Sequence, residues 1–372
     1  MLHDIGVSST TTHHHLVSEF DWSGAQNHCR LGCQLLSDFP PLESMAEAVL
    51  YHHTPWPHLS QNTDQRTARR ANLVYLVDRV DALAAPHYAT GQLLFHTQDI
   101  RDSIKERRDT YFSPVLVEVF LDASRSEAFW LNLEARAISA YLKDMLAKRT
   151  PYTATLPELR QLAAIFSRIV DAKSPFTAAH SYGVARLARF LAHTLGFGED
   201  ICAKVEIAGL LHDLGKLRIP DGILNKPAKL EFAERLIMNT HSFETYQILR
   251  QITGFSDIAP WAAYHHEEPD GSGYPFHLTS AEMPTEARIL RVADVFQAMA
   301  QDRPYRAGMS AVAIEDFLHD MVHQGRLDAA IVTCACRDMD AAMTEARSSF
   351  PLHHWQTPLV RPASVAYASL DT

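Results

Sequence analysis

Histidine and aspartate residues recur along this sequence at places where a metal centre would need them. The stretch LLHDLGK at 210–216 ends an apolar run with a His-Asp pair, and His265-His266 follow the apolar run DIAPWAAY. Asp294 lies inside another apolar run, RILRVADVF. A carboxylate among apolar neighbours is costly without a partner, and metal coordination would satisfy all these groups together. Imidazoles and carboxylates without cysteine suit iron, manganese or zinc.

The same constellation occurs twice in the chain. The N-terminus reads MLHDIG; His28 precedes His52 by 24 residues, and the same interval separates the equivalent histidines of the second copy. The equivalent positions are His3 and His212, Asp4 and Asp213, His28 and His241, His52-His53 and His265-His266, and Asp78 and Asp294. A lone histidine is usually a hydrogen-bonded core residue, but this order of landmarks indicates two homologous domains in tandem.

The apolar residues recur mostly at helical spacing and no strand alternation is convincing, so we predict an all-α protein. The stretch KRTPYTAT at 148–155 is the best linker candidate. We expect a first domain over 1–110 that lacks its first helices, a helical connector over 111–155, a second domain over 156–338 and an irregular C-terminal tail over 339–372.

Composition excludes several classes of protein. The net charge of −10 argues against a nucleic-acid polymer as the main partner. No apolar run approaches the ~18 residues that a membrane span needs, and the first residues do not resemble a signal peptide. The five cysteines form no disulfide or CxxC framework, so we expect reduced thiols and a cytoplasmic location.

The second copy resembles the HD-GYP subgroup of the HD-domain phosphohydrolases. The resemblance runs from about residue 160 to 338 and rests on HDLGK, IPDGILNKPAKL, HHEEPDGSGYP and RILRVADVFQAMAQDRPYR. It implies two HD-type helical domains, the second hydrolysing cyclic di-GMP at a centre of divalent metals, usually iron or manganese. The implied metal ligands are His180, His212, Asp213, His241, His265, His266 and Asp294.

The resemblance also implies catalytic and substrate-binding roles. Asp213 would bridge two ions, and Lys216 would stabilise or protonate the leaving oxygen while a water between the ions attacks phosphorus in line. Lys216 follows His212 by four residues, which predicts a single helical face for this set. The implied substrate contacts are the loop Gly273-Tyr274-Pro275, with Asp270, and the phosphate-binding Arg303 and Arg306.

Charge and departures from the family pattern refine this prediction. A local excess of cations suits a small anionic dinucleotide. Its members near the motifs are Lys216, Arg218, Lys226, Lys229, Arg288, Arg291, Arg303 and Arg306, of which Lys226 and Lys229 equally fit a solvated surface. Phe176 stands where members with three metals carry a glutamate ligand, so we predict two metals. Ser174, Glu268 and Gln297 also depart from the common residues, which bears on substrate preference and rate.

The first copy keeps nearly the whole ligand set but lacks the parts that handle substrate. Val7 replaces the lysine, and neither a Gly-Tyr-Pro loop nor an Arg-Pro-Tyr-Arg motif follows. We expect a regulatory or scaffolding domain with a residual metal, or a domain kept only for packing. Because only two residues precede His3, we also expect that the reading frame extends upstream, and that without such an extension the first domain has an open, poorly stable core.

Three functions remain open at this point. The leading one is a cyclic di-GMP phosphodiesterase, because the metal set and Lys216 are complete. A non-catalytic cyclic-dinucleotide receptor that acts through protein contacts is the alternative from another class. A phosphohydrolase of another cyclic dinucleotide or nucleotide is the third. A homodimer and signalling proteins are further candidate partners.

Overall fold

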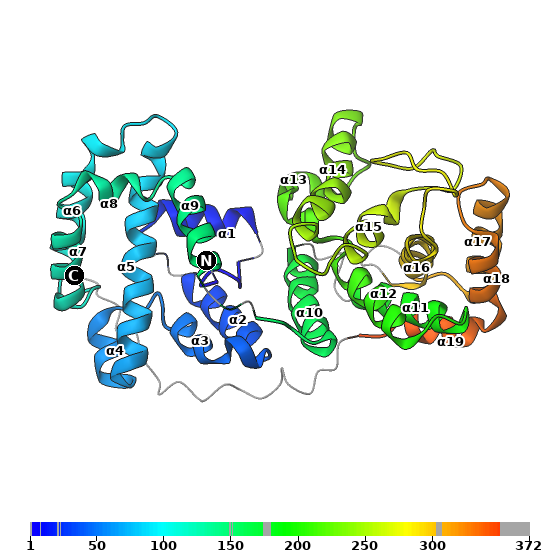
Figure 1. Ribbon diagram of the computed structural model, residues 1–372, viewed down its shortest axis with the longest axis horizontal. Coiled ribbons are helices and arrows are strands. Elements are labelled where there is room, and N and C mark those ends of the chain that lie inside the picture. Colours follow the sequence, from blue (N-terminus) through cyan, green and yellow to red (C-terminus); the bar gives the residue numbers. More distant parts are fainter. Residues whose placement is uncertain are drawn as a thin grey trace.

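The protein is built from α-helices, as the sequence predicts. The computed structural model describes residues 2–7, 9–20, 22, 24–148, 150, 152–173, 180–302 and 307–349. Within these residues the only β-pairing is two isolated bridges. Figure 1 shows two sets of helices side by side, α1–α9 and α10–α19. Among the described helices, none combines the length and apolar character that crossing a membrane requires.

The first set is organised around one long helix. Helix α5 begins after Asp64, whose side chain accepts hydrogen bonds from the N–H groups of Arg66 and Thr67 and so caps the helix. The helices of this set are α1 (Thr10–Ser18), α2 (Ala25–Ser37), α3 (Pro40–Leu50), α4 (Trp56–Asn62), α5 (Gln65–Tyr88), α6 (Thr97–Glu106), α7 (Pro114–Ala123), α8 (Glu127–Leu131) and α9 (Ala135–Ala147).

The apolar core around α5 continues past the expected domain boundary at residue 110. Tyr75 and Leu76 of α5 share a buried cluster with Phe112, Phe120 and Trp130. The indole Nε1 of Trp130 donates a hydrogen bond to the carbonyl of Ser124 at 3.0 Å. Residues 112–130 therefore pack into the first set of helices. The helical connector expected over 111–155 is limited to the residues after 130. In α9, all of which is described, no residue is buried.

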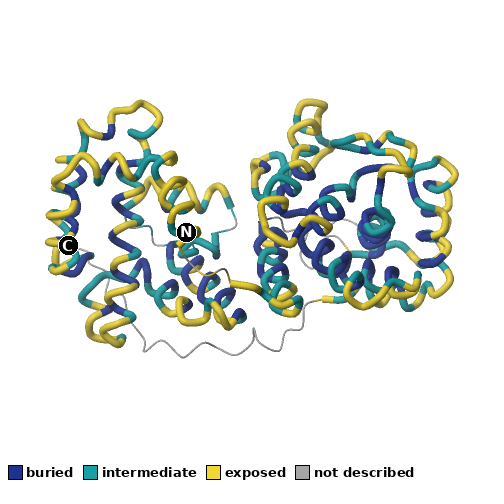
Figure 2. The backbone as a smooth tube through the Cα atoms, in the orientation of Figure 1, coloured by how far each residue is buried: buried dark blue, intermediate teal, exposed yellow. Residues whose placement is uncertain are grey.

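The second set surrounds the buried helix α16, which Figure 2 shows end-on in dark blue. Small residues of α11 and α12, such as Ala185 and Gly209, allow these helices to pack closely. The elements are α10 (Leu156–Lys173), α11 (His180–Thr194), α12 (Glu199–Leu211), η2 (Leu214–Arg218), α13 (Asp221–Leu224), α14 (Phe232–Leu249), α15 (Ile258–Ala263), η3 (Tyr264–His266), α16 (Thr285–Ala300), α17 (Ala311–His323), α18 (Ala329–Arg337) and α19 (Met339–Ala346).

The expectation of an irregular tail from residue 339 is wrong for its first part. Residues 339–346 form α19, which Asp338 caps by accepting a hydrogen bond from the N–H of Ala341. Ala342 and Ala346 lie one turn apart, and both are buried in the core of the second set. Residues 350–372 lie outside the described residues.

Helix α10 belongs to the cores of both sets. One face contributes Ala163 and Val170 to the core around α16. The other face places Ile165 and Ile169 against Leu35 of α2 and Phe39. Figure 1 shows α10 on the side of the second set that faces the first. The apolar surface of α2 is therefore covered at this place by the second domain.

The place of Trp130 in the first core can be tested by mutation. Trp130→Ala should lower the free energy of unfolding by about 3–5 kcal/mol, because it removes a fully buried indole and leaves a cavity. Tyr141→Ala on exposed α9 is the matched control and should change it by less than about 0.5 kcal/mol. Urea unfolding followed by circular dichroism measures both. Equal stabilities for the two variants would contradict the packing described here.

Candidate metal centre

The His-Asp pair of the second copy lies just beyond the C-terminal end of a buried helix. Helix α12 ends at Leu211, and the residues His212 and Asp213 are 1% and 2% exposed. The turn that follows approaches α14 closely, because a Cβ atom on Gly215 would lie 1.9 Å from the carbonyl oxygen of His241. Glycine is therefore required at this position, and the close approach brings His241 to the pair.

The carboxylate of Asp213 faces two separate sets of side chains. Its Oδ1 lies 3.5 Å from Nε2 of His241 and 3.8 Å from Nε2 of His265. Its Oδ2 lies 3.3 Å from Nε2 of His212 and 3.8 Å from Nε2 of His180. Two groups of potential ligands result, one made by His241, His265 and His266 and the other by His180, His212 and Asp213.

Backbone carbonyls fix the orientation of three of the imidazoles. Nδ1 of His212 donates a hydrogen bond to the carbonyl of Gly209. In the same way, Nδ1 of His241 donates to the carbonyl of Met238, and Nδ1 of His265 donates to that of Ala262. These bonds are 2.6–2.7 Å long, and a carbonyl only accepts, so the proton is on Nδ1. The lone pair of Nε2 then faces the centre, as in histidines that bind metal.

The second group is completed from α11 and α16. Nε2 of His180 lies 3.3 Å from Oδ1 of Asp294, and its Nδ1 lies 2.5 Å from Oε1 of Gln297. The amide oxygen accepts this proton and leaves Nε2 free to bind a cation. Gln297 departs from the family pattern, and its side chain orients His180, a predicted metal ligand.

Most, but not all, of the protonation states in this centre are those that a cation requires. Burial lowers the pKa of His265 and His266 well below its ordinary value, and that of His241 to about 4. Although burial opposes ionisation of Asp213, the charges of His212 and Lys216 hold the pKa of its carboxyl well below the usual range. Although burial opposes it, the negative charge of Asp213 raises the pKa of His212 to about 9, so a bound cation would have to displace one proton there. His241, His265 and His266, held neutral beside an ionised carboxylate, are ready ligands.

The donors also pass a test of fit for a metal. Oδ1 of Asp213 and Nε2 of His212 are buried and have no hydrogen-bond partner among the described residues. Buried polar atoms without a hydrogen-bond partner are costly, and a bound cation would satisfy both of these. Nitrogen and oxygen donors without sulfur suit iron, manganese or zinc, as expected from the sequence.

Lys216 reaches Asp213 by a different route from the one predicted. The sequence placed it on the same α-helical face, but residues 214–218 form the 3₁₀-helix η2. Three residues make one turn of such a helix, so Lys216 lies directly above Asp213. Its Nζ is 2.5 Å from Oδ2 of Asp213. The prediction of an α-helix at this place was wrong, but Lys216 does lie next to Asp213, as that prediction implied.

The Gly-Tyr-Pro loop is anchored by a buried carboxylate that the sequence reasoning did not single out. Glu267 accepts hydrogen bonds from the N–H groups of Phe276 and Leu278 at 2.6 and 2.9 Å. This anchoring positions the ring of Tyr274, which stacks on His266 with centroids 4.8 Å apart. The loop therefore borders the candidate centre.

The other predicted substrate-binding residues differ in their burial and in their hydrogen bonds. Gly273 is buried against the backbone of Glu267 and Glu268, and Pro275 is half-buried. Asp270 is exposed, but its Oδ1 accepts two hydrogen bonds from Ser272, from N–H at 2.9 Å and from the hydroxyl at 2.7 Å. Asp270 therefore stabilises the turn of its own loop. Arg303 and Arg306, like Ser174 and Phe176, lie outside the described residues.

Most of the cations counted as a local positive excess are paired with carboxylates. Arg291 bonds Glu268 at 2.6 Å, and Glu268 also accepts two hydrogen bonds from Arg326. Further pairs are Arg218 with Glu244, Lys226 with Glu234, and Arg288 with Asp328. The predicted excess is therefore largely neutralised. The sequence did not reveal this neutralisation, because most of the carboxylates that pair with these cations come from distant segments.

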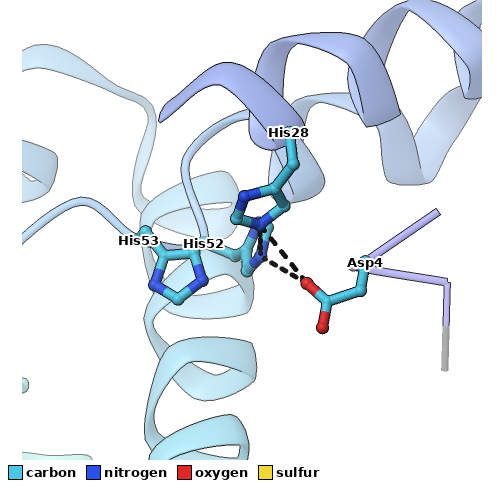
Figure 3. Close-up of side chains that lie close together, drawn as sticks. All are labelled: Asp4, His28, His52 and His53. Atoms are coloured by element: carbon cyan, nitrogen blue, oxygen red, sulfur yellow. Dashed lines mark hydrogen bonds and ion pairs between the residues drawn. The ribbon is translucent and has the colours of Figure 1, made fainter. Parts of the chain in front are cut away.

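The first copy builds a similar cluster, drawn in Figure 3. Oδ1 of Asp4 lies 3.3 Å from Nε2 of His28 and 3.7 Å from Nε2 of His52, and His53 lies alongside. Nε2 of His28 is 3.2 Å from Nε2 of His52, and the equivalent distance between His241 and His265 is also 3.2 Å.

The turns after the two His-Asp pairs are also alike. A Cβ on Gly6 would lie 2.2 Å from the carbonyl oxygen of His28, just as Gly215 approaches His241. The copies differ at Asp78, whose Oδ2 forms an ion pair of 2.8 Å with Arg79. Val295 occupies the position equivalent to Arg79 in the second copy.

Comparisons with known proteins agree with this duplication. Residues 164–331 and residues 1–83 each match a family described as HD domain. The chain is 36% identical over 348 residues to the 3′3′-cGAMP-specific phosphodiesterase 1 of Vibrio cholerae, covering 91% of this chain and 80% of that protein. It is 32% identical to the 3′3′-cGAMP-specific phosphodiesterase 3 of the same organism, covering 80% of this chain and 64% of the relative.

A further relative covers only part of the chain. A cyclic di-GMP phosphodiesterase response regulator of Xanthomonas campestris is 35% identical over 170 residues, which is 45% of this chain and 44% of that protein. A crystal structure of a cyclic GMP-AMP specific phosphodiesterase of V. cholerae shares the fold, with a TM-score of 0.56 and 24% identity over 92% of this chain and 85% of the other. The chain thus belongs to the HD-domain phosphohydrolases of the HD-GYP type.

Proposed function

We propose that this chain is a metal-dependent phosphodiesterase that hydrolyses a cyclic dinucleotide in its second domain. The observation that carries the proposal is the position of Asp213, whose two oxygens face two different groups of imidazoles. A carboxylate in that position suits a bridge between two cations. A receptor without catalysis would not need this bridge, nor Lys216 beside it.

In this proposal each group of ligands holds one divalent ion, iron or manganese. His180, His212 and Asp294 serve one ion, His241, His265 and His266 serve the other, and Asp213 serves both. Two such ions would supply Lewis-acid polarisation of the phosphodiester and acidify a water for in-line attack.

The chain's own groups then do the remaining work. Lys216 is the cation beside Asp213 and stabilises or protonates the leaving 3′-oxygen. The ring of Tyr274, stacked on His266, forms one wall of the site with Gly273 and Pro275. Asp270 shapes this loop, and Arg303 and Arg306 bind the phosphates.

The relatives favour 3′3′-cGAMP over cyclic di-GMP as the substrate to try first. The two that align with 91% and 80% of this chain are named as 3′3′-cGAMP-specific, whereas the cyclic di-GMP enzyme aligns with 45%. Cyclic di-GMP, the substrate expected from the sequence, is the second candidate.

For the first domain we propose a bound metal without catalysis. Asp4, His28, His52 and His53 bring four donors together, and Oδ1 of Asp4 is buried with no hydrogen-bond partner among the described residues. The sequence has Val7 in place of the lysine, so this position offers no cation to a leaving group.

Hydrolysis should separate the roles of Asp213 and Lys216. We expect anaerobic wild-type protein with Fe²⁺ or Mn²⁺ to hydrolyse 3′3′-cGAMP faster than cyclic di-GMP. Asp213→Ala should abolish turnover, and Lys216→Ala should lower kcat by about 10²–10³-fold without loss of metal. Product formation followed by chromatography measures the rates. Binding of either dinucleotide by the wild type without any turnover would refute the proposed activity and favour a receptor.

Metal content should report the two domains separately. The double variant His28→Ala with His52→Ala should lose about one ion per chain, because two of the four donors are gone. His241→Ala should lose metal from the second domain only. The exposed His193→Ala is the control and should retain the wild-type content. Elemental analysis of anaerobically loaded protein measures this, and equal content in the first variant and the control would exclude metal from the first domain.

The metal-free protein should become less stable in weak acid. The folded state keeps His241, His265 and His266 neutral, whereas the unfolded chain protonates them below the ordinary pKa of 6.5. The unfolded state then binds more protons, so stability falls as the pH drops from 6.5 toward the folded pKa of His241, about 4. Thermal melting of chelated protein measures this fall. His241→Gln should reduce its slope, and His193→Gln should not.

A further inference from the structure

The segment that carries Lys216 is held from outside by a buried lysine. Lys173, the last residue of α10, is 7% exposed. Its Nζ donates a hydrogen bond to the carbonyl of Leu217 at 2.7 Å and lies 3.5 Å from Oδ1 of Asp221. A buried ammonium group needs such partners, so Lys173 binds both ends of residues 217–221. Leu217 is the residue next to Lys216.

Asp221 connects this arrangement to the first domain. Its Oδ2 accepts a hydrogen bond of 2.6 Å from the backbone N–H of Thr10, the first residue of α1. The first N–H groups of a helix have no partner inside the helix and favour a carboxylate. The two oxygens of Asp221 therefore meet groups of different domains, Thr10 on one side and Lys173 on the other.

An apolar contact between the domains reaches the same turn. Leu217 packs at the edge of the cluster that Leu35 and Phe39 form with Ile165 and Ile169 of α10. Ile5, which follows Asp4, packs at the edge of this cluster as well. The turns after the two His-Asp pairs thus border one shared cluster. An ion pair of 3.3 Å between Arg168 and Asp38 lies at the same interface.

We propose that Lys173 and Asp221 are positioning residues for Lys216, and that the first domain completes this pair through the N–H of Thr10. The inference rests on the proposed phosphodiesterase function. The degenerate domain then contributes to catalysis in the second domain by fixing the backbone on which the leaving-group lysine stands. Loss of the Thr10 contact frees Asp221 from one side, and the carbonyl of Leu217 and the adjacent Lys216 become less well ordered.

A single substitution can remove this contact with little disturbance of α1. Thr10→Pro deletes the N–H, and proline is well tolerated at the first position of a helix. The preceding residue, Ser9, already has the extended backbone that proline requires, with φ −123° and ψ 147°. Thr10→Ala keeps the N–H and removes only the side chain, so it is the matched control.

Kinetics and metal content together test the positioning role. We expect Thr10→Pro and Lys173→Met to lower kcat about tenfold, since misplacement of a catalytic group acts on the chemical step. KM and metal content should stay near wild type in both variants, and so should the thermal midpoint of Thr10→Pro. Thr10→Ala should match wild type, and Lys173→Arg should recover most of the rate that Lys173→Met loses. Equal kcat for Thr10→Pro and Thr10→Ala would overturn the proposal.

Hydrogen exchange provides a readout that does not depend on activity. Amides of residues 214–221 should exchange faster in Thr10→Pro than in Thr10→Ala, while those of α16 exchange equally in both. If the wild type hydrolyses no cyclic dinucleotide, the proposed function fails, and this comparison still decides whether the first domain orders the turn. Equal exchange at 214–221 in the two variants would overturn the positioning role in either case.

Discussion

The structure of the second domain depends on one buried carboxylate. Asp213 lies beyond the end of α12, and helices α11, α14 and α16 with the turn η3 each direct an imidazole or a carboxylate into its neighbourhood. An ionised group at that depth is costly unless cations or donors surround it. The carbonyl contacts that orient His212, His241 and His265, and the close approach at Gly215, all serve to surround it.

The parts of the site that are local in sequence could be predicted well. The His-Asp and His-His pairs have fixed spacing, and their repetition indicates both clusters from the sequence alone. The partners of these groups could not be predicted, because they depend on packing between distant segments. Glu267 and the pairing of Glu268 with Arg326 are examples. The 3₁₀ turn under Lys216 was missed because three-residue and four-residue periods look alike over one turn.

Domain limits were harder to predict than the site, for a related physical reason. Apolar periodicity says that a residue is buried, but not against which helices. Trp130 could equally have packed on a connector of its own, yet it packs with α5. Similarly, Ala342 and Ala346 have too little apolar surface to mark α19 as a core helix in sequence, although α19 is buried through them.

The two-faced helix α10 limits how independently the two copies can evolve. Here Leu35 and Phe39 of the degenerate copy share a cluster with Ile165 and Ile169, and the same cluster touches Leu217. Substitutions in contact are generally not additive, so a change on either side alters which changes the other side tolerates. The first domain thereby supplies part of the scaffold of its neighbour, so a change at Leu35 or Phe39 is expected to affect the stability of the second domain as well.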